Sequence, residues 1–105
     1  MDAEALFDEM ASQLVPRGAS TGAMFGSRAL KLGDKVFATS GQGRIVVKLG
    51  AGTAPHASAL QIGELFDPSG KGRPMKEWIV LDEDQDPDAV AALVEAAFEL
   101  AQSRA

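Results

Sequence analysis

Hydrophobic positions near both ends of the chain repeat at the spacing of an α-helix. At the start, apolar residues recur every three or four positions and then stop before Pro16 and Gly18, residue types that commonly end a helix. Near the other end, Asp86-Pro87 has the form of an N-cap followed by a first-turn proline. The two predicted apolar faces comprise Ala3, Leu6, Phe7, Met10, Ala11 and Leu14, and Val90, Leu93, Val94, Ala97, Phe98 and Ala101.

Between these helices the pattern changes to short apolar stretches separated by the turn residues Gly33-Asp34 and Gly41-Gln42-Gly43. Such turns are typical of tight hairpins. After the second turn, apolar Ile45 and Val47 alternate with Val46 and Lys48. This period of two, with charge on one side, predicts a sheet with one packed face and one face wetted by solvent. The predicted antiparallel meander has strands over 29–32, 36–39 and 44–49.

The remaining stretch predicts one more helix and two more strands. Thr53 is suited to cap a helix that runs through about Ile62, and Gly63 ends it. Strands over 64–66 and 76–81 flank a polar, turn-rich loop. The element order is therefore α-β(3)-α-β(2)-α. We expect a single α+β domain over residues 1–105, a two-layer sandwich with a five-stranded antiparallel sheet and its helices on one face.

Composition narrows the chemistry that this chain can perform. Its 105 residues contain no cysteine and no tyrosine and only one histidine, His56. Disulfides, thiolate zinc sites and cysteine nucleophiles are therefore excluded, and few side chains remain for proton transfer near neutral pH. We expect a non-enzymatic protein with no metal and no cofactor. The absence of cysteine fits a reducing cytoplasm, and no apolar run approaches the ~18 residues that a membrane span requires.

Three local motifs resemble functional sites but lack essential residues. Gly70-Lys71 is not a P-loop, because Leu65 stands where the earlier glycine belongs. The acidic segment 82–88 lacks the glycine and the final glutamate of a calcium loop, so we interpret it as a solvated loop that caps the last helix. His56 has no second histidine or cysteine to form a metal site, and we interpret it as a surface residue.

Charge is distributed unevenly along the chain. The net charge is -5, yet residues 16–49 contain six bases and one acid, whereas both terminal segments are acidic. One interpretation is that the acidic helices neutralise a basic sheet; the other is a dedicated anion-binding face. The overall negative charge and the lack of a readout motif make nucleic acid an unlikely ligand.

The remaining candidates are large apolar residues and the bases near them. Met24-Phe25-Gly26 and Trp78 suit a hydrophobic core, and their functional alternative is a partner-binding patch with arginines on its rim. We therefore expect either a protein-interaction domain, with exposed edge strands that permit a homodimer, or a domain that binds a small anion. The candidate binding residues are Arg28, Arg44, Lys48, Arg73, Lys76 and Trp78.

The order of several short motifs resembles the TfoX N-terminal domain family. Met24-Phe25-Gly26, 34–38 and 44–49 follow the family's Met-Phe-Gly, Gly-Lys-Met-Phe-Ala and Leu-Tyr-Leu-Lys segments. The resemblance covers about residues 4–102 and implies the same α-β(3)-α-β(2)-α sandwich. Farther along, the residues that resemble the family's Phe, Gly-x-x-Met and aromatic strand are Phe66, Gly72, Arg73, Pro74, Met75 and Trp78.

This resemblance also implies a regulatory role. The family is named after a regulator of bacterial competence that acts alongside the cyclic-AMP receptor protein and carries a second, helical domain. This chain ends at Ala105 and has Ser27-Arg28-Ala29-Leu30 in place of a glycine-rich continuation, so we do not expect the regulator's whole activity to carry over. The family supplies no catalytic residue that maps onto this chain.

Overall fold

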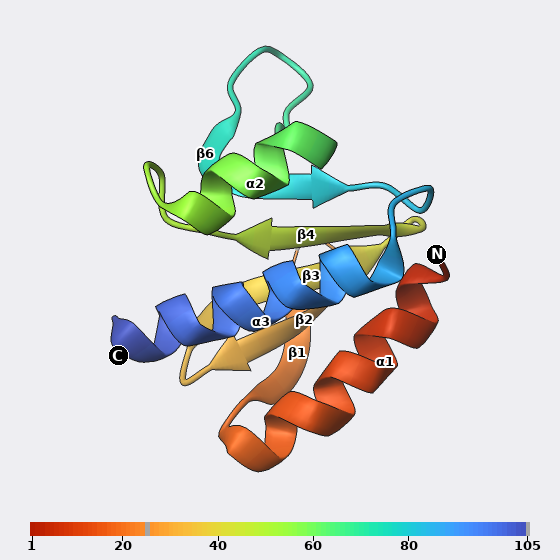
Figure 1. Ribbon diagram of the computed structural model, residues 1–105, viewed down its shortest axis with the longest axis vertical. Helices are drawn as coiled ribbons and strands as arrows, with labels where there is room; N and C mark the ends of the chain where they lie inside the picture. Colours follow the sequence, from red (N-terminus) through yellow and green to blue (C-terminus); the bar gives the residue numbers. More distant parts are fainter. Residues whose placement is uncertain (25, 105) are drawn as a thin grey trace.

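The computed structural model describes residues 1–24 and 26–104, which form helices on one side of an antiparallel sheet (Figure 1). The helices of this part of the chain are α1 (Ala3–Leu14), the short 3-10 helix η1 (Val15–Arg17), α2 (Ala54–Ile62) and α3 (Pro87–Ser103). The strands are β1 (Ser20–Met24), β2 (Ser27–Leu32), β3 (Lys35–Gly41), β4 (Arg44–Lys48), β5 (Glu64–Phe66) and β6 (Met75–Leu81).

The sheet has the strand order β1-β2-β3-β4-β6-β5, and every neighbouring pair is antiparallel. The first four strands follow one another as hairpins. The chain then crosses through α2 to the far edge, forms β5, and returns as β6 between β5 and β4. As a result, β1 and β5 are the two edges of the sheet.

The predicted α+β class, antiparallel sheet and three helices are confirmed, but the predicted strand number is wrong. The sheet has six strands rather than five, because Ser20–Met24 forms the additional edge strand β1. Residues 20–23 are all exposed, so this strand has no alternation of buried and exposed side chains to reveal it. Lys31 of β2 extends across it, and a Cβ atom at Gly22 would lie 3.0 Å from Lys31 Cε.

All three α-helices pack against the same face of the sheet, which we call the helix face (Figure 1). The centre of this layer is Phe98 of α3, whose ring meets Phe37 of β3 edge-on with centroids 5.5 Å apart. Both predicted helix faces point into this core. Its buried strand residues are Leu30, Phe37, Ala38, Ile45, Val47, Ile79 and Leu81.

The α2 segment is capped by Thr53 and meets β6 at His56 and Gly63. The Thr53 side chain accepts a hydrogen bond from the His56 amide, as the predicted cap requires. His56 itself is only 9% exposed, and its Nε2 donates to the Lys76 carbonyl over 2.8 Å. The interpretation of His56 as a surface residue is therefore wrong: the ring is a buried link between α2 and β6. A Cβ at Gly63 would lie 2.2 Å from the Val80 carbonyl oxygen, so this position requires glycine for close approach.

Candidate functional site

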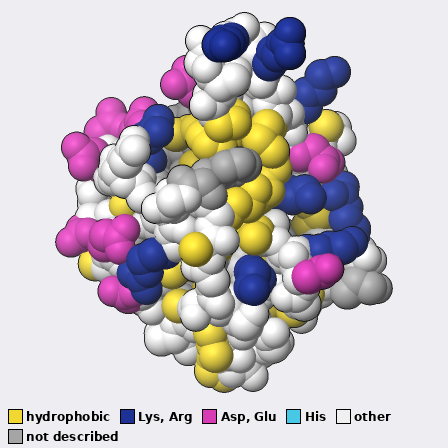
Figure 2. Space-filling model, turned by 180° about the vertical axis from the view of Figure 1, so that it is seen from behind, with side chains coloured by type: hydrophobic (Ala, Val, Ile, Leu, Met, Phe, Trp, Pro, Cys, Tyr) yellow, Lys and Arg dark blue, Asp and Glu magenta, His cyan; other side chains and the backbone are white. Residues whose placement is uncertain are grey.

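The face of the sheet opposite the helices, the open face, carries a second apolar cluster. Val46, Trp78 and Val80 are buried here with exposures of 7%, 6% and 4%. The hydrophobic side chains gather near the middle of this face in Figure 2. The expectation of a simply solvent-wetted face is therefore wrong. The partly buried residues packed against this cluster are Met24, Val36, Phe66 and Met75.

Basic side chains surround this apolar cluster. Strand alternation places Arg44 and Lys48 of β4 on the same face as Val46, and Lys76 of β6 on the same face as Trp78. The Lys48 ammonium lies 5.8 Å from the centroid of the Trp78 ring, within range of a cation–π interaction. Lysine and arginine side chains flank the apolar area on several sides in Figure 2.

The ion pairs among the described residues all lie on the other side of the sheet or on its helices. Arg28 binds Glu4 and Asp8 of α1 at 2.9 and 2.6 Å, and its guanidinium also lies over the Phe7 ring. The hydrogen bond to Asp8, followed by that to Glu4, raises the pKa of Arg28 above its ordinary value. The remaining pairs join Arg17 to Glu95 and Arg104 to Glu77.

The other cations form no ion pair with an acid in the described part of the chain. The interpretation of the basic strands as partners of acidic helices therefore accounts for Arg28 but not for the bases of the open face. These cations carry unpaired positive charge, and Arg44, Lys48 and Lys76 place part of it beside the apolar cluster. They are Lys31, Lys35, Arg44, Lys48, Lys71, Arg73 and Lys76.

The loop between β5 and β6 is organised by one carboxylate, Asp67. Its Oδ1 accepts from the Ser69 amide, the Ser69 hydroxyl and the Gly70 amide at 3.1, 2.7 and 3.1 Å. Its Oδ2 accepts from the amides of Gly72 and Arg73 at 2.9 and 3.2 Å. The Ser69 hydroxyl, with help from these amides, holds the pKa of Asp67 below its ordinary value. These hydrogen bonds order the loop that carries Arg73. The turn-forming Asp-Pro-Ser-Gly sequence could have indicated such an ordered loop.

A polar pocket of about 440 Å³ opens beside Arg44. Thr39 lines it; the residue is only 5% exposed, but its hydroxyl, which forms no hydrogen bond within the described residues, is not sealed from solvent. The side chains of Ser27, Gln42 and Arg44 are likewise unpaired within this part of the chain. Sequence reasoning missed Ser27, Thr39 and Gln42, because they meet only through the pairing of β2, β3 and β4. The pocket is lined by Ser27, Thr39, Gly41, Gln42, Arg44, Val46, Phe66, Asp67 and Pro68.

The structure separates the candidate residues into three groups. Arg44, Lys48 and Lys76 lie on the open face, with Arg73 in the adjacent Asp67 loop. Trp78 lies beneath them as a buried support rather than an exposed contact. Arg28 binds α1 and does not join the others. Phe25, part of the Met-Phe-Gly motif, lies outside the described residues.

Comparison with protein-family models, curated proteins and solved structures finds no match to this chain. Across residues 1–24 and 26–104, no group of three or more histidine, cysteine, aspartate or glutamate side chains is arranged to hold a metal ion. None of the helices in this range combines the length and the apolar character needed to cross a bilayer.

Proposed function

We propose that this protein is a non-enzymatic interaction domain whose open face binds an acidic, partly apolar surface of a protein partner. The observation that carries the proposal is the contrast in charge pairing. Arg17, Arg28 and Arg104 form ion pairs with acids of the same chain, whereas Arg44, Lys48 and Lys76, beside the open-face apolar cluster, form none within the described residues.

This combination suits recognition of a protein surface. Apolar side chains at the centre of an interface supply burial, and arginine and aromatic residues are enriched among its energetically important contacts. Unpaired cations on the rim select an acidic partner and accelerate its approach. The buried Trp78 ring is not available for base stacking, which distinguishes this face from sheets that bind single-stranded nucleic acid.

The test is affinity capture from native cells with charge-reversed variants. The double variant Arg44→Glu/Lys76→Glu changes only the open face, and we expect recovery of a specific partner to fall by about tenfold or more. Lys35→Glu is the control, because Lys35 is exposed and does not belong to the apolar cluster. Recovery that is equal for the wild type and the double variant contradicts the proposal.

The resemblance to the TfoX N-terminal domain belongs to the same proposal. A regulatory interaction domain of that kind would need a protein-binding face and no catalytic group. Identification of the captured partner tests this link directly: a partner in transcriptional control supports it, whereas a partner from an unrelated process argues against it.

The polar pocket beside Arg44 favours a second candidate function, the binding of a small anionic ligand. Ser27, Thr39 and Gln42 contribute polar side chains to this pocket, and Arg44 supplies the positive charge. A thermal-shift screen of phosphates, nucleotides and carboxylates tests this function. A ligand at a hundred times its Kd stabilises the protein by about 2.7 kcal/mol, and Thr39→Val should abolish that shift. A screen without any shift opposes this second function.

A further inference from the structure

A smaller cavity lies at the opposite end of β4 from Arg44, where α3 ends above the start of β3. Its volume is about 80 Å³, far below the roughly 300–1,000 Å³ of pockets that hold drug-sized ligands. Any occupant must therefore be a group of a few heavy atoms. The lining residues are Lys35, Val36, Phe37, Lys48, Ala97, Leu100, Ala101 and Arg104.

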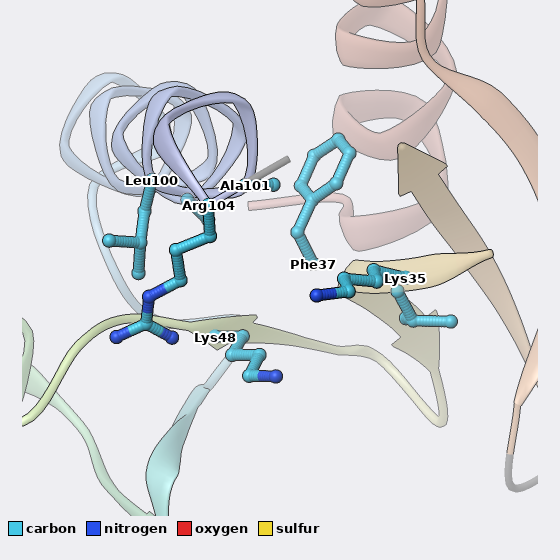
Figure 3. Close-up of a pocket in the computed structure, with 8 residues that line it drawn as sticks. Lys35, Phe37, Lys48, Leu100, Ala101 and Arg104 are labelled. Atoms are coloured by element: carbon cyan, nitrogen blue, oxygen red, sulfur yellow. The ribbon is translucent and has the colours of Figure 1, made fainter. Parts of the chain in front are cut away.

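Cations from two separate elements, Lys35 and Arg104, approach this cavity. Figure 3 shows Lys35 of β3 and Arg104 at the end of α3 approaching it from opposite sides, with Lys48 of β4 below. Within the described residues, one of these cations forms an ion pair: Arg104 binds Glu77 at 3.2 Å. This contact uses the two terminal nitrogens of the guanidinium, which has five N–H donors in total, so Arg104 retains donors for another oxyanion.

The rest of the lining is apolar. Phe37 and Ala97 are buried at its base, and Leu100 and Ala101 form the half-buried wall contributed by α3. A fully polar anion such as inorganic phosphate would leave these carbon surfaces without a partner. A ligand that fits both parts of the cavity carries one negative group and a short apolar chain.

We propose that this cavity binds a small organic carboxylate. The carboxylate accepts hydrogen bonds from the Lys35 ammonium and the Arg104 guanidinium, and its short alkyl chain packs against Phe37 and Leu100. This site is independent of the protein-binding role proposed for the open face, because neither Lys35 nor Arg104 belongs to that face.

The test is an NMR titration of the whole chain with butyrate as the probe. We expect saturable shifts of the backbone amides of Phe37, Leu100 and Ala101. Butyramide, which has the same shape without the charge, should cause no such shifts. The fluorescence of the single tryptophan, Trp78, gives a second readout, because the Lys48 ammonium lies over its ring.

Variants assign the binding to this cavity. Lys35→Gln should raise the Kd for butyrate by about tenfold, the loss expected for one charge-assisted hydrogen bond, and Arg104→Gln should act in the same direction. Lys31→Gln is the matched control, because it removes the same charge from a residue outside the cavity and should leave the Kd unchanged. Melting curves of each variant confirm that the fold is intact.

Three results would overturn the proposal. The first is an absence of saturable shifts with butyrate. The second is equal binding of butyramide, which would show that the charge is irrelevant. The third is an equal loss in Lys31→Gln and Lys35→Gln, which would show nonspecific attraction to surface cations rather than binding in this cavity. After any of these results, we would interpret Lys35 and Arg104 only as charges that offset the negative end of the α3 dipole.

Discussion

The two faces of the sheet use the same kinds of residue in different ways. On the helix face, apolar side chains are buried beneath α1, α2 and α3, and Arg28 is bound to Glu4 and Asp8. On the open face, a smaller apolar cluster has no helix above it, and the neighbouring Arg44, Lys48 and Lys76 form no ion pair within the described chain, although Asp82, Glu83 and Asp84 line a hollow with Arg44. Part of the positive charge in residues 16–49 therefore binds α1 and α3, through Arg28 and Arg17, and the rest forms no ion pair within the described residues.

The strongest test of this contrast is to remove a large side chain from each face. Phe98→Ala deletes a fully buried ring from the helix side and should cost about 3–5 kcal/mol of stability. Met75→Ala, on the open face, should cost less than about 1 kcal/mol, because the side chain is only partly buried. Urea denaturation measures both values. Equal losses would show that the open-face cluster is as much a part of the core as Phe98.

The next largest effect is expected at Gly63, between α2 and β5. Gly63→Ala places a Cβ atom against the Val80 carbonyl and the Leu81 side chain, and the backbone cannot move away without disturbing β6. We expect a loss of about 1–3 kcal/mol, as for other overpacked sites. Gly52→Ala is not a suitable control, because Gly52 has a positive φ. Ala57→Gly is the control, because it leaves the contact between Gly63 and Val80 intact. A melting temperature unchanged by Gly63→Ala would refute this account of the junction.

Identical charge reversals on the two faces sharpen the comparison further. Arg28→Glu places a third carboxylate beside Glu4 and Asp8, so it should lower the melting temperature measurably. Arg44 forms no ion pair within the described residues, but Arg44→Glu places a carboxylate near Asp82, Glu83 and Asp84, so it should lower stability less than Arg28→Glu does while it weakens partner binding. Differential scanning calorimetry at low and high salt compares them. The reverse order of stability would contradict the division of charges between the two faces.

The smallest effect on folding stability is expected when the pH is lowered. The Ser69 hydroxyl lowers the pKa of Asp67, and Arg104 lowers the pKa of Glu77. Because the folded pKa lies below the unfolded one, each group stabilises the fold above its unfolded pKa, and this contribution is lost as the pH falls through the folded pKa. Asp67→Asn and Glu77→Gln should each flatten the decline of stability on the acidic side of about pH 4. Denaturation across pH measures this slope, and unchanged slopes would oppose both assignments.

Local pattern in the sequence predicted the helix face well and the open face poorly. The alternation of Ile45 and Val47 correctly placed them against the helices. Val46 and Trp78 are brought onto one face by pairing of β4 with β6, which are far apart in the chain and whose register no local pattern reveals. Arg28 and Arg44 look alike in sequence, yet only the three-dimensional arrangement shows that one meets α1 and the other faces outward.

The edge strand β1 also bears on how the protein behaves in a crowded cell. Its five residues include no charge and no proline, and such an edge is prone to pair with other chains and aggregate. Lys31, from the neighbouring strand, lies across Gly22 and brings its ammonium to this edge. Two copies that met edge to edge would bring these charges together. A single lysine on the second strand thus supplies the charge that the first strand's own residues lack.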